Sequence, residues 1–369
     1  MRLEHITGME AGYTMGLRPD GRELLVVCIK GTFTLPRDDG ELQLAEKQVP
    51  LVESDIFTGE PGFSAPLYES DYAPVKPRCD VLLNGNAYAP GGKPAERVEV
   101  GLAVGTMKKF FAVVGDRFWL KGPAGFGPGR TLPFVSKPIG YDTAFGGADP
   151  NGPDPTMAEA CMANPVGRGF HHYLDEQFVT GTPLPNTEEL DNPVCSPHGA
   201  YRPIAFGPVG RGWQPRATFA GTYDQHWLDN IFPFLPPDFD DRYYQAAPED
   251  QQIPYPQGGE RVTLLNLTPE GRTDFLLPKK AMLVWYLLKN GEEESRQAML
   301  DTIILEPGAG RCMLVWRAHL PLKKNMFEVE MVVIGHNPED RHKVVPEEDI
   351  AFPLPLESSD AAAEPVEEE

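Results

Sequence analysis

The segment ERVEVGLAVG, residues 96–105, carries the clearest fold signal in the chain. Its even-numbered positions from 98 to 104 are all apolar, whereas the odd-numbered positions begin with the charged residues Arg97 and Glu99. This alternation with a period of two is typical of a half-buried β-strand. In the next segment, KKFFAVVGDRFWLKG (108–122), Gly115-Asp116 separates two aromatic-rich runs and predicts a type II′ hairpin turn.

The segment LLVVCIKGTFTL, residues 24–35, also predicts a strand. One face of it is apolar and contains Ile29, Phe33 and Leu35. The other face is polar and contains Lys30, Thr32 and Thr34. Gly31 interrupts the apolar face, which suggests a β-bulge at that position.

The C-terminal part repeats this pattern of short strands and turns. The runs 261–268 and 273–278 flank the turn-like segment PEGR (269–272), and AMLVWYLL (281–288) is followed by Asn290-Gly291, a strong hairpin signal. Three further strands are expected at 299–307, 311–320 and 327–335, the last alternating at Phe327, Val329, Met331 and Val333. The sequence therefore predicts a mostly β fold, with antiparallel meander sheets forming a sandwich or an open barrel.

Residues 121–260 have a different character. They are rich in Pro, Gly, Asn and Asp, yet they contain many aromatic residues, which favours ordered loops over disorder. Two short helices are expected, at MAEACMA (157–163) and at DQHWLDNIF (224–232), where Asp224 is a candidate N-cap. We interpret this region as an ordered, loop-built surface that lies over the sheets.

The expected organisation is one large β-rich domain, residues 1–356, followed by a tail. Within the domain, a sheet at about 20–120 and a sheet at about 261–335 flank the loop-rich middle. The tail ESSDAAAEPVEEE (357–369) holds six carboxylates and no Lys or Arg, so we expect it to be disordered and solubilising.

Charge and cysteine content narrow the function classes. The net charge of −21 argues against nucleic acid and anionic membranes as partners, because phosphate binding requires clustered Lys and Arg. The five cysteines are odd in number and form no C-x-x-C pair, which fits a reducing compartment. The N-terminus lacks an apolar signal core, and the longest apolar run is too short to span a bilayer, so a cytoplasmic protein is expected.

A metal site is the first chemical possibility. Cys195 and His198 have a ligand-like spacing, and other Cys and His residues of the same region are Cys161, His171 and His172. A zinc site requires four converging ligands, and this set matches no familiar zinc-finger spacing. We therefore regard Cys195 and His198 as weak candidates and expect no bound metal or other cofactor.

Carboxylate catalysis is the second possibility. Asp238, Asp240 and Asp241 could supply a glycosidase pair or bind calcium, together with nearby Asp224, Glu249 and Asp250. Arg242 follows two of them directly, so ion pairs and turn-capping bonds are the favoured interpretation. The chain has no G-x-S-x-G motif, and the glycine-rich stretch 122–130 is not followed by Lys-Ser/Thr. The sequence thus favours a protein that is not an enzyme.

Loop residues remain as candidates for binding a partner or for shaping the surface that binds it. In YDTAFGGADP (141–150), an aromatic anchor precedes a glycine pair and turn-forming acids, as expected either for a structural turn or for a binding loop. The full set of candidates is Tyr141, Asp142, Phe145, Gly146, Gly147, Asp149, Asn164, Arg168, Trp213, Asp224, Trp227, Asp238, Asp240, Arg242 and Tyr243.

Several of these blocks occur in an order that resembles one family. The blocks are YDTAFGG-AD (141–149), NPVGRG (164–169), IAFGPVGRGWQPR (204–216), the stretch from GTYD (221) to Gln251, and the GGE-V-L-NLTPEG block (258–271). Together they resemble the bacterial domain-of-unknown-function family 2169, and the resemblance extends from about Leu24 to Leu320.

The resemblance implies a role in type VI secretion. Members of the family are regarded as adaptors or chaperones that bind a toxic effector, often one with a PAAR-type domain, and help to load it onto the VgrG spike. A co-chaperone is a further expected partner. Many relatives carry pentapeptide repeats, which this chain lacks, and the resemblance assigns no catalytic residues.

Two alternatives stay open at this point. One is a metal- or carboxylate-dependent hydrolase built on the loops of residues 121–260. The other is a structural or carbohydrate-binding component of the secretion apparatus. The favoured interpretation is an acidic cytoplasmic adaptor whose aromatic loops bind one protein partner, because aromatic and Arg side chains commonly anchor interfaces.

Overall fold

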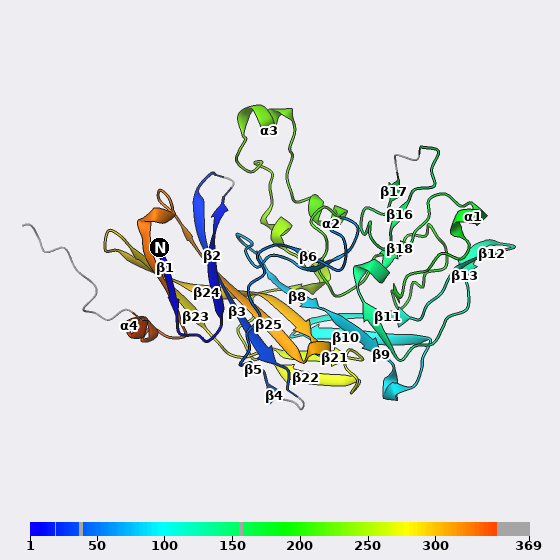
Figure 1. The fold of residues 1–369 in the computed structure, drawn as a ribbon, viewed down its shortest axis with the longest axis horizontal. Coiled ribbons are helices and arrows are strands. Elements are labelled where there is room, and N and C mark those ends of the chain that lie inside the picture. Colours follow the sequence, from blue (N-terminus) through cyan, green and yellow to red (C-terminus); the bar gives the residue numbers. More distant parts are fainter. Residues whose placement is uncertain (19, 37–39, 155–157, 345–369) are drawn as a thin grey trace, which may run out of the picture.

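Two large β-sheets and a loop-rich region make up the protein (Figure 1). The computed structural model describes residues 1–18, 20–36, 40–154 and 158–344, so the predicted acidic tail lies outside the described residues. The fold is mostly β with a few short helices and a sheet that curls into a half-barrel, which confirms the predicted fold class. Within the described ranges, no helix has both the length and the apolar composition needed to cross a membrane.

The first sheet follows the order β1-β26-β23-β24-β25-β3-β2. Its neighbours pair antiparallel except for β1 with β26, and β8 joins it by parallel pairing with β24. Its strands are β1 (Arg2–His5), β2 (Glu10–Leu17), β3 (Glu23–Thr34), β5 (Gln43–Leu44), β8 (Cys79–Leu83), β20 (Gln252–Ile253), β23 (Met282–Leu288), β24 (Glu293–Glu306), β25 (Arg311–Pro321) and β26 (Val329–Gly335). The predicted hairpin at Asn290-Gly291 is confirmed, since it joins β23 to β24.

The second sheet follows the order β19-β11-β10-β21-β22-β4. Its strands are β4 (Gly40–Glu41), β10 (Arg97–Val104), β11 (Met107–Val114), β19 (Thr187–Glu188), β21 (Arg261–Leu265) and β22 (Arg272–Leu276). The alternation predicted at 98–104 is confirmed, because the four apolar side chains are buried while Arg97 and Glu99 are exposed. The predicted turn at 269–272 is also confirmed and joins β21 to β22. Apolar side chains of both sheets meet in one core.

Short pairs and helices form the loop-rich region and the connections. The pairs are β6 (Ile56–Phe57) with β7 (Pro66–Tyr68), β9 (Gly85–Tyr88) with β14 (Ser136–Ile139), β12 (Trp119–Gly122) with β13 (Gly125–Pro128), β15 (Phe145–Gly146) with β18 (Arg168–Gly169), and β16 (Ala148–Asp149) with β17 (Glu159–Ala160). The helices are α1 (Glu176–Val179), α2 (Gln214–Ala217), α3 (Gln225–Asn230) and α4 (Asp340–Val344), with 3₁₀ turns η1 (Pro90–Gly92), η2 (Tyr141–Thr143), η3 (Asp241–Tyr244), η4 (Glu249–Gln251), η5 (Pro307–Ala309) and η6 (Met326–Glu328).

Two predictions about glycines are wrong. Gly115-Asp116 forms no hairpin turn, because β11 pairs with β10 and β19 while β12 pairs with β13. A Cβ on Gly115 would lie only 1.8 Å from the Leu132 carbonyl oxygen, so this glycine permits a close backbone approach. Gly31 marks no bulge, because its pairing with β25 is regular; it leaves room for the Met9 and Phe33 side chains instead.

Two further predictions need correction. The helix expected at 157–163 is wrong, since Glu159 and Ala160 form β17 and pair with β16. Phe327 does not belong to the buried alternation of β26; it lies in η6 and is 70% exposed.

The polar face expected along β3 is buried rather than open to solvent. Lys30 is 1% exposed, and its Nζ lies 2.8 Å from Asp71 Oδ2. A second buried ion pair follows on β25, where Arg317 Nε donates to Asp301 Oδ2 at 2.6 Å. In each pair the carboxylate compensates the buried positive charge, that of Lys30 or of Arg317.

Candidate functional site

Residues 218–241 form an arm that projects from the body of the protein (Figure 1). The arm leaves the body after α2 and returns to it at the start of η3, and α3 lies at its tip. It contains six aromatic residues, five Asp and no Lys or Arg. The arm therefore combines apolar rings with negative charge.

The tip of the arm folds around Trp227. The Asp224 side chain accepts a hydrogen bond from the Trp227 backbone N–H at 2.8 Å, which confirms the predicted N-cap of α3. The indole Nε1 donates to the Phe234 carbonyl at 2.9 Å. Tyr223 and Phe232 make edge-on contacts with the indole, at centroid distances of 4.8 and 5.6 Å. The tip is thus held by its own hydrogen bonds and ring contacts.

The same packing leaves apolar surface in solvent. Tyr223 and Leu228 are each 53% exposed, and Phe232 is 63% exposed. Phe234 is also exposed, but its ring lies against Gly21 in the turn between β2 and β3. Single exposed apolar residues are ordinary, whereas several grouped on one projection mark an interaction site. We call Tyr223, Leu228 and Phe232 the tip patch.

Arg216, at the root of the arm, is buried and clamps both ends of it. Its guanidinium forms a bidentate ion pair with the Glu69 carboxylate. It also donates to the Val209 carbonyl at 2.7 Å and, through Nη2, to the Tyr243 carbonyl at 2.7 Å. α2, η3 and the segment around residue 69 are therefore joined through one side chain.

The candidate residues at the base of the arm form local contacts. Asp238 accepts hydrogen bonds from the backbone N–H and the hydroxyl of Thr222, at 3.0 and 2.7 Å, and so links the two legs. Asp240 caps η3 and pairs with Arg242 at 2.6 Å, and the Arg242 guanidinium holds the pKa of Asp240 below its ordinary value. Arg242 also lies over the Phe219 ring, 4.2 Å from its centroid. These contacts match the expected ion pairing and turn capping.

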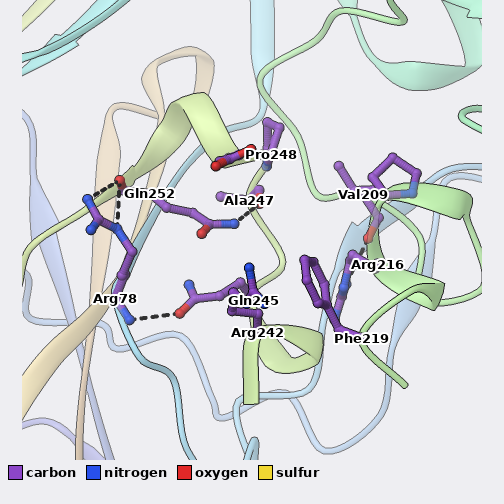
Figure 2. Close-up of a pocket in the computed structure, with 11 residues that line it drawn as sticks. Arg78, Val209, Arg216, Phe219, Arg242, Gln245, Ala247, Pro248 and Gln252 are labelled. Atoms are coloured by element: carbon purple, nitrogen blue, oxygen red, sulfur yellow. Dashed lines mark hydrogen bonds between the residues drawn. The ribbon is translucent and has the colours of Figure 1, made fainter. Parts of the chain in front are cut away.

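A pocket of about 510 Å³ lies at the arm's root (Figure 2). It is lined by Arg78, Val209, Pro215, Arg216, Phe219, Arg242, Gln245, Ala247, Pro248, Glu249 and Gln252. Its arginines already have partners: Arg78 donates to the Gln252 carbonyl at 2.9 Å, Arg242 pairs with Asp240, and Arg216 pairs with Glu69. The pocket therefore presents satisfied polar groups beside apolar walls.

A neighbouring pocket of about 410 Å³ contains the buried Lys109. Burial lowers the pKa of Lys109 to about 8, although Asp250 favours the charged form. Its Nζ donates to Asp250 Oδ1 at 3.0 Å and to Gln251 Oε1 at 2.7 Å. Asp250 also pairs with Arg202 at 3.0 Å. Asp250 is therefore engaged in structural ion pairs.

The candidates of the YDTAFGG block lie inside the loop region. The Asn164 side chain donates to the carbonyls of Tyr141 and Phe145, at 2.9 and 3.1 Å, and all three residues are buried. Gly146 and Gly147 have φ values of 147° and 110°, and a Cβ on Gly146 would lie 2.2 Å from the Asn164 carbonyl oxygen. The glycine pair is therefore required by the close approach of two loops.

Asp149 is also buried and organises the adjacent turn. Its carboxylate accepts from the backbone N–H groups of Asn151, His172 and Tyr173, at 3.1, 2.9 and 2.9 Å. Burial raises the pKa of Asp149, but the hydrogen bonds from Tyr173 and Asn151 outweigh it and hold the pKa below its ordinary value. Asp149 therefore fixes the backbone of three loop residues.

The remaining candidates of the loop region are structural as well. Asp142 accepts from the Thr58 hydroxyl and the Ala65 N–H, each at 2.8 Å. Arg168 donates to Asn186, and buried Trp213 meets Tyr141 edge-on at 5.3 Å. This group shapes the loop region from within.

The weak metal candidates lie close to an aromatic hydroxyl. Cys195 Sγ lies 3.4 Å from the Tyr201 hydroxyl, and the Tyr201 hydroxyl accepts from the Cys195 backbone N–H at 3.0 Å. In the part of the chain that the structure describes, no three His, Cys, Asp or Glu residues are grouped so that they could hold a metal ion.

Sequence reasoning missed the tip patch and the Arg216 clamp. Leu228 and Phe232 stand within the expected helical segment 224–232 and Tyr223 directly precedes it, but their exposure depends on how far the arm projects. Arg216 belongs to a quoted block, yet nothing in its local sequence marks it as buried, whereas nearby Arg211 is only half-buried. Its partner Glu69 is 147 positions away. The acidic and aromatic composition of 218–241 was the available signal.

One of the comparisons with known proteins, that with family models, finds a match. The matching family model, described as "Uncharacterized protein conserved in bacteria (DUF2169)", covers residues 20–317 of the 369-residue chain. No curated protein and no solved structure matches the chain significantly. Because the match covers most of the chain, including the whole second sheet, the loop region and the whole arm, the chain belongs to this bacterial DUF2169 family.

Proposed function

We propose that this protein is an adaptor or chaperone that binds a type VI secretion effector, one with a PAAR-type domain, and keeps it stable until it is loaded onto the VgrG spike. The observation that carries the proposal is the tip patch on the projecting arm. Such a patch can cover apolar surface of a partner by reversible binding. The secretion context comes from what the family resemblance implies.

The arm suits this role for a physical reason. The tip patch sits on a frame made by the Asp224 cap, the ring contacts of Trp227 and the Arg216 clamp at the root. A preformed surface loses less conformational entropy on binding than a flexible one does. Tyr223 and Phe232 add aromatic area, which is enriched among residues that dominate interface energies.

Co-expression with a PAAR-type effector, encoded beside the gene of this protein, tests the proposal. The effector is produced alone, with the full chain, with a Tyr223→Ser/Leu228→Ser/Phe232→Ser variant, and with a Phe63→Ser control. Phe63 is 79% exposed and lies outside the arm, so the control removes an exposed ring without touching the tip patch. We expect the full chain and the control to raise the soluble effector yield and to co-elute with it, whereas the arm variant does neither. No complex with the full chain would refute the adaptor role.

A further inference from the structure

The charge around the tip patch identifies the chemistry of the segment that it binds. Asp224 and Asp229 flank Leu228 on α3, four positions before it and one after it. Asp224 accepts from the Trp227 N–H and Asp229 from the Gln225 side-chain amide at 2.8 Å, so both bind neutral donors. Within the described ranges of the chain, neither Asp224 nor Asp229 forms an ion pair.

The lower part of the arm extends this negative field. Asp238 accepts hydrogen bonds from the neutral donors of Thr222. Asp241 contributes less to the field, because burial raises its pKa and Arg18 and His319 act on it as nearby basic groups. Among the five arm aspartates in the described chain, only Asp240 forms an ion pair, with Arg242. The exposed rings of the tip patch thus lie on the same short segment as Asp224 and Asp229, which form no ion pair within the described residues.

We propose that the tip patch binds an apolar partner segment flanked by Lys or Arg. The apolar side chains of this segment would cover Leu228 and Phe232, while its cations would approach Asp224 and Asp229. The exposed Tyr223 ring offers a cation a second contact, through its π face. A second copy of this chain fits poorly, because two such arms would bring like charges together. This inference rests on the proposed function and adds the chemistry of the partner.

Charge complementarity of this kind changes the rate of association more than the final affinity. Complementary charges at an interface rim speed the encounter and impose a salt dependence. Exposed charge pairs contribute about 0.2–1 kcal/mol each, which corresponds to about 1.4- to 5-fold in affinity. At 0.15 M salt such charges act over a Debye length of about 8 Å, so carboxylates close to the patch dominate.

Three labelled peptides test the partner chemistry. Fluorescein-labelled peptides share a Leu/Trp core and carry Lys, Gln or Glu flanks, and their binding to the full chain is measured by fluorescence anisotropy. We expect the Lys peptide to bind most tightly and the Glu peptide least tightly. Raising NaCl from 50 to 500 mM should weaken binding of the Lys peptide and leave binding of the Gln peptide nearly unchanged. Equal binding of the Lys and Glu peptides would overturn the inference.

Variants locate the binding on the arm. Asp224→Asn/Asp229→Asn removes two charges with little change of shape and should weaken binding of the Lys peptide about fivefold at 50 mM NaCl. Glu4→Gln/Glu99→Gln removes two exposed charges outside the arm and serves as the matched control. Leu228→Ser/Phe232→Ser should abolish binding of both the Lys and Gln peptides. If the arm variants bind like the control, the segment binds elsewhere and the inference fails.

The effector complex separates the two proposals. If the effector co-purifies with the full chain but its affinity changes neither with salt nor in Asp224→Asn/Asp229→Asn, the adaptor role stands and the charge inference fails. If the Lys peptide binds the arm as expected but no effector complex forms, the inference about partner chemistry stands and the proposed effector fails.

Discussion

Replacing Arg216 with Met should loosen the arm at its root. Arg216 is 3% exposed, and its guanidinium contacts Glu69, the Val209 carbonyl and the Tyr243 carbonyl. Met fills a similar volume but donates no hydrogen bond. The substitution therefore leaves Glu69, whose side chain is 7% exposed, without its main partner.

The magnitude follows from the remaining contacts. Breaking a buried ion pair by removing one partner costs about 3–5 kcal/mol. Arg211 Nη2 lies 3.2 Å from Glu69 Oε2, so the orphaned carboxylate keeps one cation. We therefore expect the lower end of the range, about 3 kcal/mol of unfolding free energy. In the double variant Arg216→Met/Glu69→Met the buried charge disappears too, so we expect part of the loss to be recovered.

Two assays report on different parts of this prediction. Urea unfolding of the full chain measures the free energy of unfolding, with Arg296→Met as a control. Arg296 pairs with Glu294 on a more exposed surface, at 2.6 Å with side chains 44% and 33% exposed, so its loss should stay within about 0.5 kcal/mol. Limited chymotrypsin digestion measures opening of the arm, because residues 218–241 contain six aromatic residues and no Lys or Arg.

The result that would refute the clamp is specific. If Arg216→Met lowers the unfolding free energy by less than about 1 kcal/mol and leaves chymotrypsin cleavage of the arm unchanged, Arg216 does not hold the root. A large loss of stability with no change in arm cleavage would instead place its contribution in the core alone.

Three other substitutions probe the fold, the arm and a buried lysine. The folded-state pKa of Lys109 is about 8 and lies below the ordinary value of 10.5. Between pH 8 and pH 10.5 the unfolded chain therefore binds more protons than the folded chain, so the free energy of unfolding should rise with pH in this range. Lys109→Met should remove this rise in urea unfolding curves. Gly115→Ala places a Cβ 1.8 Å from the Leu132 carbonyl oxygen and should cost about 3 kcal/mol of unfolding free energy, whereas Gly127→Ala, with no neighbour within 4 Å, should be nearly neutral. Asp224→Ala removes the N-cap and should destabilise α3 by about 1 kcal/mol, seen as faster hydrogen exchange in the arm, whereas Asp224→Asn should largely preserve it.

Local patterns predicted the strands well because each strand has its own buried face. The alternation at 98–104 and the turn at 269–272 depend on neighbours close in sequence, and both are confirmed. The predictions at Gly31 and Gly115 are wrong because two roles of glycine look alike in sequence. A glycine can form a turn or bulge, or it can leave room for a side chain or carbonyl group from a distant part of the chain. Only the positions of Met9 and Leu132 distinguish the two cases.

The candidate site was less predictable than the sheets. The N-cap at Asp224 is a local signal, so α3 could be predicted from it. Whether Leu228 or Phe232 is buried depends on how far the arm stands from the sheets, which no local pattern encodes. Conversely, the YDTAFGG block has the composition of a binding loop, yet buried Asn164 ties it to the interior.

The arrangement of the arm also explains how a group of apolar side chains stays exposed at its tip. A patch of Tyr, Leu and Phe would normally collapse onto the nearest apolar surface. Here the rings of Tyr223 and Phe232 pack edge-on against Trp227, so each is held in place while part of its surface remains open. The surrounding carboxylates oppose pairing of two arms by like-charge repulsion. Under the proposed function, both properties would favour a basic, apolar partner over a second copy of the chain.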